Sequence, residues 1–233
     1  MLTAMQTTRW HTYADAAALE QAATAWILAA ARQAIDRSGA FHLVLAGGNT
    51  PRRVYQALRT TSTDWSRWHI WFGDERCLPP EHPERNSRMA ADAWLDHVAI
   101  PAAQIHVMPT HLPAIVGADE TARLYEKTLL GQGDFDLVLL GLGEDAHTAS
   151  LFPGHDWGTS DAAPAVLAVF DAPKPPPERV SLSARRLAAA REVVFLVSGA
   201  GKRQAVTAWR AGQSIPAAAI APAGGVDILI DFA

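Results

Sequence analysis

The amino-acid sequence predicts a doubly wound α/β fold, in which a mostly parallel, Rossmann-like sheet carries helices on both faces. Helix-like and strand-like segments alternate along the 233 residues, which is the order found in parallel sheets. The strand-like segments are short and apolar throughout, FDLVLLG at 135–141 most clearly, and such strands are buried on both faces. Polar, glycine-bearing segments follow several of these strands, which is where such folds bind ligands.

The first half of the chain supplies three expected strands. We expect a helix at 13–38 that stops at Ser38-Gly39, followed by the apolar strand FHLVLA at 41–46, which ends in two glycines. Further helices are expected at 51–59, 86–98 and 117–130, and further strands at 68–72 (WHIWF) and, more weakly, at 105–109 (IHVMP).

The second half continues the same alternation. Strands are expected at 135–141, 166–170, 193–197 and 226–230, with a helix at 200–211. The proline-rich stretch DAPKPPPERV at 171–180 is expected to be a stiff loop. Because it is interpreted as a loop across one compact unit, residues 1–233 are predicted to form a single domain.

Composition excludes several classes of protein. Hydrophobic residues make up 49% of the chain and charged residues 19%, a balance that supports a core. The net charge of −4 provides no positive field, so we expect no nucleic-acid and no membrane partner. Cys77 is the one cysteine, and the N-terminal segment lacks the features of a signal peptide. We therefore expect a soluble cytoplasmic protein.

Four polar segments are expected to meet at one edge of the sheet. GGNTP, GDER, GLGEDAH and SGAGK each come directly after a strand. Ligands of open parallel sheets bind at the carboxyl ends of the strands. That edge is the predicted site.

The segment GGNTP has the features of a phosphate-binding turn. Gly47 and Gly48 allow a tight turn and close approach of an anion, and Asn49 is tolerated in such a turn. Thr50 is a good N-cap and Pro51 suits the first helical position, so a helix N-terminus would face the ligand. The alternative is a capped turn that binds nothing.

The segment GDER places Asp74, Glu75 and Arg76 at the end of a strand. Arg76 could bind an anion or an oxyanion while a neighbouring acid holds it. The alternatives are a solvated turn or, more weakly, a metal site, for which no second cluster has suitable spacing.

GLGEDAH allows two interpretations. Residues 141–146 match a dinucleotide fingerprint, and Asp161 lies at the spacing of a ribose-binding acid. However, Glu144 and Asp145 would then repel the pyrophosphate at the helix N-terminus, which argues against that interpretation. The second interpretation makes Asp145 and His147 a catalytic pair, because a carboxylate orients a histidine for proton transfer. A histidine that merely caps a helix is the alternative.

Cations on two further segments could meet an anion. Lys202 follows a strand, and Arg179 follows the proline run. An exposed, solvated lysine is the alternative for Lys202. His155, Arg185 and Arg186 are lesser candidates.

In order along the chain, AGGNTP, WFGDERCLPP with ERNS, FDLVLLGLGEDAHTASLFPG, PPPERVSLSARRL and FLVSGAGK resemble the 6-phosphogluconolactonase family. That family is part of a larger group with the glucosamine-6-phosphate deaminases. HTASLFPG is the most specific block, and the resemblance spans about residues 46–202. It implies hydrolysis of 6-phospho-D-glucono-1,5-lactone in the pentose phosphate pathway, with no metal or organic cofactor.

The resemblance also implies roles. His147 would be the general base and Asp145 its support, while Asp74 and Arg76 would line the site. The remaining substrate-binding residues would hold the phosphate and the sugar: Gly47, Gly48, Asn49, Thr50, Arg179 and Lys202. The chain departs from the family at Ala146, where glycine is common, and at Asn49, where serine is frequent.

Three rival functions differ in what they require. A glucosamine-6-phosphate deaminase needs further acids in and after the histidine loop, but none follows His147 until Asp156. A sugar-phosphate-binding sensor without turnover is a second rival, and a dehydrogenase a distant third. The expected partner is a small sugar-phosphate lactone, and the expected state is a monomer or weak homo-oligomer.

Overall fold

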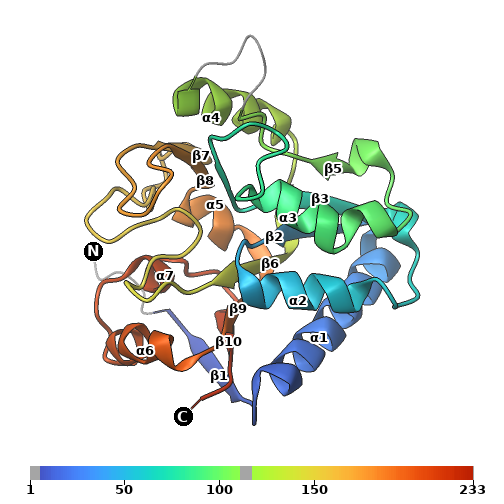
Figure 1. Cartoon of the computed structure of the whole chain (residues 1–233), viewed down its shortest axis with the longest axis horizontal. Helices are drawn as coiled ribbons and strands as arrows, with labels where there is room; N and C mark the ends of the chain where they lie inside the picture. The colour runs from blue at the N-terminus through green and yellow to red at the C-terminus, as the bar shows by residue number, and fades with distance from the viewer. Residues whose placement is uncertain (1–5, 111–116, 233) are drawn as a thin grey trace.

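A parallel sheet forms the centre of the molecule. The computed structural model describes residues 6–110 and 117–232 (Figure 1). Within these residues, seven strands pair in the order β1-β10-β9-β6-β2-β3-β5, and every pair is parallel. Their bounds are β1 (Thr8–Thr12), β2 (Phe41–Leu45), β3 (Trp68–Phe72), β5 (Ile105–His106), β6 (Phe135–Gly141), β9 (Ala190–Val197) and β10 (Val226–Ile230). The predicted fold class is confirmed.

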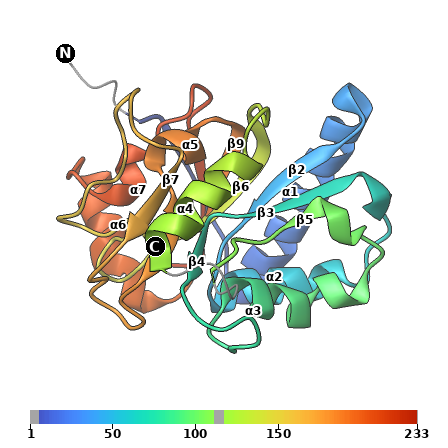
Figure 2. The ribbon, with the colours of Figure 1, turned by 90° about the horizontal axis from the view of Figure 1, so that it is seen from above.

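Helices cover both faces of this sheet. The α-helices are α1 (Ala16–Ser38), α2 (Asn49–Leu58), α3 (Asn86–Ala93), α4 (Gly117–Thr128), α5 (Ala184–Ala188), α6 (Arg203–Arg210) and α7 (Pro216–Ala219). Short 3-10 turns are η1 (Trp65–Arg67), η2 (Leu95–His97), η3 (Ala102–Gln104) and η4 (Ala200–Lys202). Figure 2 shows α1, α2 and α3 on one side of the molecule and α5, α6 and α7 on the other. None of the described helices is long and apolar enough to cross a membrane.

Aromatic side chains of the strands pack against the helices on both faces of the sheet. On one face, Phe41 meets Trp68 edge-on at 4.8 Å, and Trp68 meets Trp94, just after α3, at 5.7 Å. On the other face, Trp71 lies 6.3 Å from Tyr125 of α4. Since successive residues of a strand point to opposite faces, Trp68 and Trp71 reach different layers.

The N-terminal strand β1 was not predicted. The helix expected from residue 13 begins at Ala16, because the Asp15 side chain caps it by accepting from the Ala18 N–H at 2.8 Å. The residues before it pair with β10, where Arg9 and His11 both bind Asp227. The polar sequence TRWHT gives little sign of a strand, and its position is set by these long-range contacts.

A second, antiparallel sheet of three strands lies beside the main one. It consists of β4 (Asp74–Arg76), β8 (Arg179–Leu182) and β7 (Val166–Val169) in that order. The expectation that 166–170 joins the parallel sheet is therefore wrong, and the expected loop at 171–180 ends as a strand. The short strand β5 and the 3-10 turns at Leu95–His97 and Ala200–Lys202 also shorten the elements expected there.

Glu75 fixes the loop between β4 and α3. Its side chain is fully buried and accepts from the backbone N–H groups of Arg76, Asn86 and Ser87, each at 2.8 Å. It also lies 3.3 Å from the Arg85 guanidinium, which is itself buried. Helix α3 has no side-chain cap at Arg85, so Glu75 satisfies the N–H groups at its start. Glu75 is thus structural, and alternation turns Asp74 and Arg76 to the opposite face.

The substitution Glu75→Gln should reduce the free energy of unfolding by about 3 kcal/mol, because it leaves the Arg85 charge buried and unpaired. Urea denaturation would measure the loss. Glu81→Gln is the matched control, since Glu81 is exposed and its ion pair with Arg88 is long, at 3.5 Å. The change in the free energy of unfolding should stay below about 0.5 kcal/mol. Equal stability of the two variants would contradict a structural role for Glu75.

Candidate functional site

A cleft opens where the central strands end. Its volume is about 190 Å³, and it lies at the carboxyl ends of β2, β3 and β6, bordered by β8 and η4. The sheet order places β2 beside β6, but the chain leaves β2 toward β3 and leaves β6 toward β9. Loops that diverge in this way leave a crevice between them. Of the predicted site residues, those that line it are Gly47, Gly48, Asp74, Arg76, His147, Arg179 and Lys202.

Two arginines face each other across the small sheet. Arg76 of β4 is the direct partner of Arg179 of β8, and both line the cleft. Like charges opposite each other on paired strands repel. The Arg76 Nη1 donates to the Glu84 carbonyl at 2.5 Å, while its buried Nε has no partner in the described chain. This pair therefore favours an anion in the cleft.

Asp74 is held by two side chains that the sequence did not single out. It accepts from Ser150 Oγ at 2.6 Å and from Asn86 Nδ2 at 2.9 Å, and all three residues are buried. Asn86 also packs so close to Gly47 that a Cβ there would lie 2.0 Å from its Oδ1. Gly47 is thus required by close packing, and Asn86 belongs to the cleft wall. Its place in the ERNS segment gave the only sequence signal.

The turn after β2 differs in detail from the predicted phosphate-binding turn. Gly48, with φ of +108°, is the N-cap of α2, and no side chain caps the helix. Thr50 is therefore not the N-cap, and Asn49 is already the first helical residue. Neither Asn49 nor Thr50 is among the lining residues, but the N–H groups of a first helical turn have no intrahelical acceptor. The helix start can thus offer N–H groups to an anion.

His147 and Asp145 form the expected pair. The imidazole Nδ1 hydrogen-bonds to Asp145 Oδ1, so that Nδ1 carries the proton and Nε2 keeps a free lone pair. His147 lines the cleft, and its ring lies 4.8 Å from that of Phe152. This arrangement suits proton abstraction by Nε2.

The surroundings of the pair favour a neutral histidine and an ionised aspartate. Burial lowers the pKa of His147 below its ordinary value, although Asp145 acts in the opposite direction. Burial by itself would raise the pKa of Asp145, but the hydrogen bond with His147 and the nearby Lys174 bring it below its ordinary value. A neutral imidazole beside a carboxylate is ready to accept a proton near pH 7.

A strained turn carries the pair. Ala146 has a φ of +67° and Ala149 a φ of +48°, conformations that are costly for residues with a Cβ. The Ala146 N–H donates to the Gly143 carbonyl at 3.1 Å, and the Gly143 N–H donates to the His147 carbonyl at 2.7 Å. The position where the family often has glycine therefore does adopt positive φ.

Lys202 follows β9, in the short turn that precedes α6. Lys202 ends η4 and lines the cleft, and the loop before it is fixed by Asp231, which accepts from Ser198 Oγ and from the Gly199 N–H.

Arg185 and Arg186 do not reach the cleft. Arg185 binds the Ala163 carbonyl, and Arg186 lies 3.8 Å over the Phe135 ring. His155 is exposed outside the cleft lining.

Lys174 is a further residue near the pair that sequence reasoning missed. Its Nζ lies 3.8 Å from Asp145 Oδ1. The proline-rich stretch predicted only a stiff loop, so no sequence signal pointed to this lysine. In the described part of the chain, no three His, Cys, Asp or Glu residues are placed to hold a metal ion.

Comparison with known proteins shows what the chain is similar to. The family model "Glucosamine-6-phosphate isomerases/6-phosphogluconolactonase" matches residues 14–229. A 6-phosphogluconolactonase of Synechocystis sp. is 39% identical over 85% of this chain and 85% of its own, and one of Nostoc sp. is 39% identical over 74% of this chain and 72% of its own. The crystal structure of 6-phosphogluconolactonase from Thermotoga maritima has a TM-score of 0.87 at 26% identity, covering 97% of this chain and all of the other.

The substitution Gly143→Ala should break the Asp145–His147 hydrogen bond. An added Cβ would lie 2.0 Å from His147 Nδ1 and 2.5 Å from Asp145 Oδ1, so the imidazole has to move. NMR of the His147 ring should show loss of the hydrogen-bonded Nδ1 proton. Gly133→Ala, where a Cβ meets nothing within 4 Å, is the control and should leave that signal in place. An unchanged signal in Gly143→Ala would refute the close-approach argument.

Proposed function

Because the chain belongs to the glucosamine-6-phosphate isomerase/6-phosphogluconolactonase family, we propose that it hydrolyses 6-phospho-D-glucono-1,5-lactone to 6-phospho-D-gluconate, a step of the oxidative pentose phosphate pathway. The observation that carries the proposal is the neutral base His147, paired with Asp145, in the same cleft as Arg76, Arg179 and Lys202. The base suits hydrolysis of a lactone, and the three cationic side chains suit a substrate that carries a phosphate.

The reaction needs only the groups in this cleft. His147 Nε2 removes a proton from water, and the resulting hydroxide attacks the C1 carbonyl of the lactone. Arg76, with its unpaired Nε, stabilises the negative charge that develops on the carbonyl oxygen. The bond from C1 to the ring oxygen then breaks, and the imidazolium returns its proton to the C5 oxygen. The products are a carboxylic acid and a free C5 hydroxyl.

The cationic residues and the start of α2 hold the rest of the substrate. Arg179, Lys202 and the N–H groups at Gly48, Asn49 and Thr50 bind the phosphate and the sugar. Asp74, fixed by Ser150 and Asn86, accepts from a sugar hydroxyl. Since the lactone is a reactive ester, fixing its orientation and stabilising its charge supply most of the acceleration.

The deaminase is the second candidate, because the family model covers both activities. Amino-sugar isomerisation needs additional acids near the histidine. The first acid after His147 is Asp156, and its side chain accepts from the Gly158 N–H at 2.9 Å in an exposed turn outside the cleft lining. This observation favours the lactonase.

The proposal includes the setting of the enzyme. Residues 1–233 form one domain, supported by a core in which side chains from both sheets pack together. The location is the cytoplasm, which the single cysteine Cys77 supports. The working state is a monomer or a weak homo-oligomer.

The substitution His147→Ala should reduce lactone hydrolysis, measured above the spontaneous rate, by about 10²- to 10⁴-fold, because it removes the base. His155→Ala is the control, since His155 is exposed and outside the cleft, and it should keep wild-type activity. Ammonia release from glucosamine 6-phosphate is measured in parallel. Full activity of His147→Ala would discard His147 as the base, whereas ammonia release without lactone hydrolysis would establish the deaminase.

The pH dependence of kcat/KM should report the His147 base. Protonated His147 is inactive, so kcat/KM rises with pH through a midpoint below the ordinary histidine value of about 6.5 and is constant above it. Asp145→Asn removes the group that raises the pKa of His147, so the midpoint should move to lower pH. The plateau should fall by about 10- to 100-fold, since the ring is no longer oriented. A midpoint that moves to higher pH in Asp145→Asn would contradict this pairing.

A further inference from the structure

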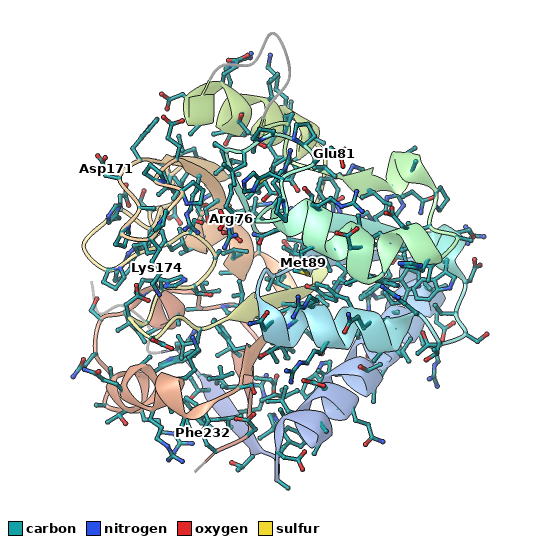
Figure 3. The ribbon with its side chains drawn as sticks, in the orientation of Figure 1. Arg76, Glu81, Met89, Asp171, Lys174 and Phe232 are labelled. Carbon is teal, nitrogen blue, oxygen red and sulfur yellow. The ribbon has the colours of Figure 1, made fainter. Side chains whose placement is uncertain are left out.

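The loop between β7 and β8 brings a cation to the base. Lys174 Nζ lies 3.8 Å from Asp145 Oδ1, the same oxygen that binds His147 Nδ1. One carboxylate oxygen thus lies between an imidazole and an ammonium group. In Figure 3, Lys174 lies on the loops to the left of Arg76, which is near the centre of the molecule.

The backbone of this loop also binds the arginine on the other side of the cleft. Arg179 donates from Nη2 to the carbonyls of Lys174 at 2.9 Å and Pro175 at 3.2 Å, and from Nε to the carbonyl of Pro176 at 3.1 Å. Arg179 is almost fully buried and lines the cleft. Lys174 therefore contacts Arg179 through its backbone carbonyl and Asp145 through its side chain.

We propose that Lys174 is a positioning residue, whose ammonium group shares the Asp145 carboxylate oxygen with His147, limits the attraction of that carboxylate for the imidazole, and links the base to the loop that binds Arg179. Nothing in the lactonase mechanism above requires this lysine. The inference rests on the proposed function only for its kinetic test, because the geometry of the three groups is a property of the free protein.

The charges around His147 predict the direction of the effect. Those that act on its imidazole or line the same cleft are Asp145, Asp74, Lys174, Arg76, Arg179 and Lys202. After burial, the carboxylates raise the pKa of His147, whereas Lys174 lowers it. Lys174 also lowers the pKa of Asp145. Its removal should therefore make His147 easier to protonate.

The first test is an NMR titration of His147 in the free protein. Lys174→Met should move the midpoint to higher pH by on the order of 0.5 pH unit, since the lysine is half exposed and its charge is screened. Lys174→Arg keeps the charge and should titrate like the wild type. Lys127→Met removes an exposed lysine from α4 and should leave the His147 midpoint unchanged. The effect of Lys174→Met should shrink at 1 M salt.

The second test is the pH profile of lactone hydrolysis. In Lys174→Met, the midpoint for kcat/KM should shift upward as in the titration, and kcat should fall while KM stays within about two-fold. A His147 midpoint that is unchanged in Lys174→Met overturns the proposal, and a rise in KM alone would show that Lys174 binds substrate instead. A wild-type protein without lactonase activity would overturn the proposed function, while the NMR result would still decide the role of Lys174.

Discussion

The architecture depends on the point where the chain reverses its direction across the sheet. β2 and β6 are hydrogen-bonded neighbours, yet the chain passes from β2 to one side and from β6 to the other. The loops after these strands cannot cover the sheet edge between them. The crevice therefore follows from backbone topology, and the turn that carries His147 and the start of α2 face each other across it.

The small antiparallel sheet completes the crevice from the side. Successive side chains of a strand face opposite sides, so adjacent residues of β4 have different roles. Glu75 points into the protein and holds the start of α3, whereas Asp74 and Arg76 point to the cleft. Pairing of β4 with β8 then fixes Arg179 opposite Arg76. A segment as short as three residues thus both stabilises the fold and lines the cleft.

Local sequence patterns predicted the features that depend on local physics. Apolar runs such as 135–141 indicated buried parallel strands, and the glycine-bearing turns after them indicated the site. The features that were missed depend on distant partners. β1 is stabilised by β10 and Asp227, and the contact of Lys174 with Asp145 crosses from one loop to another. Ala146 stands where the family often has glycine, and its positive φ is the conformation that glycine adopts most easily.

The facing arginines place two like charges at paired positions of neighbouring strands. Backbone pairing of β4 with β8 holds Arg76 and Arg179 in register, and the Asp74 carboxylate offsets their mutual repulsion. An anion bound near both guanidinium groups would reduce the repulsion that remains between them. By thermodynamic linkage, the same ligand also protects the chain against unfolding. The free energy of unfolding would thereby rise with the concentration of that ligand.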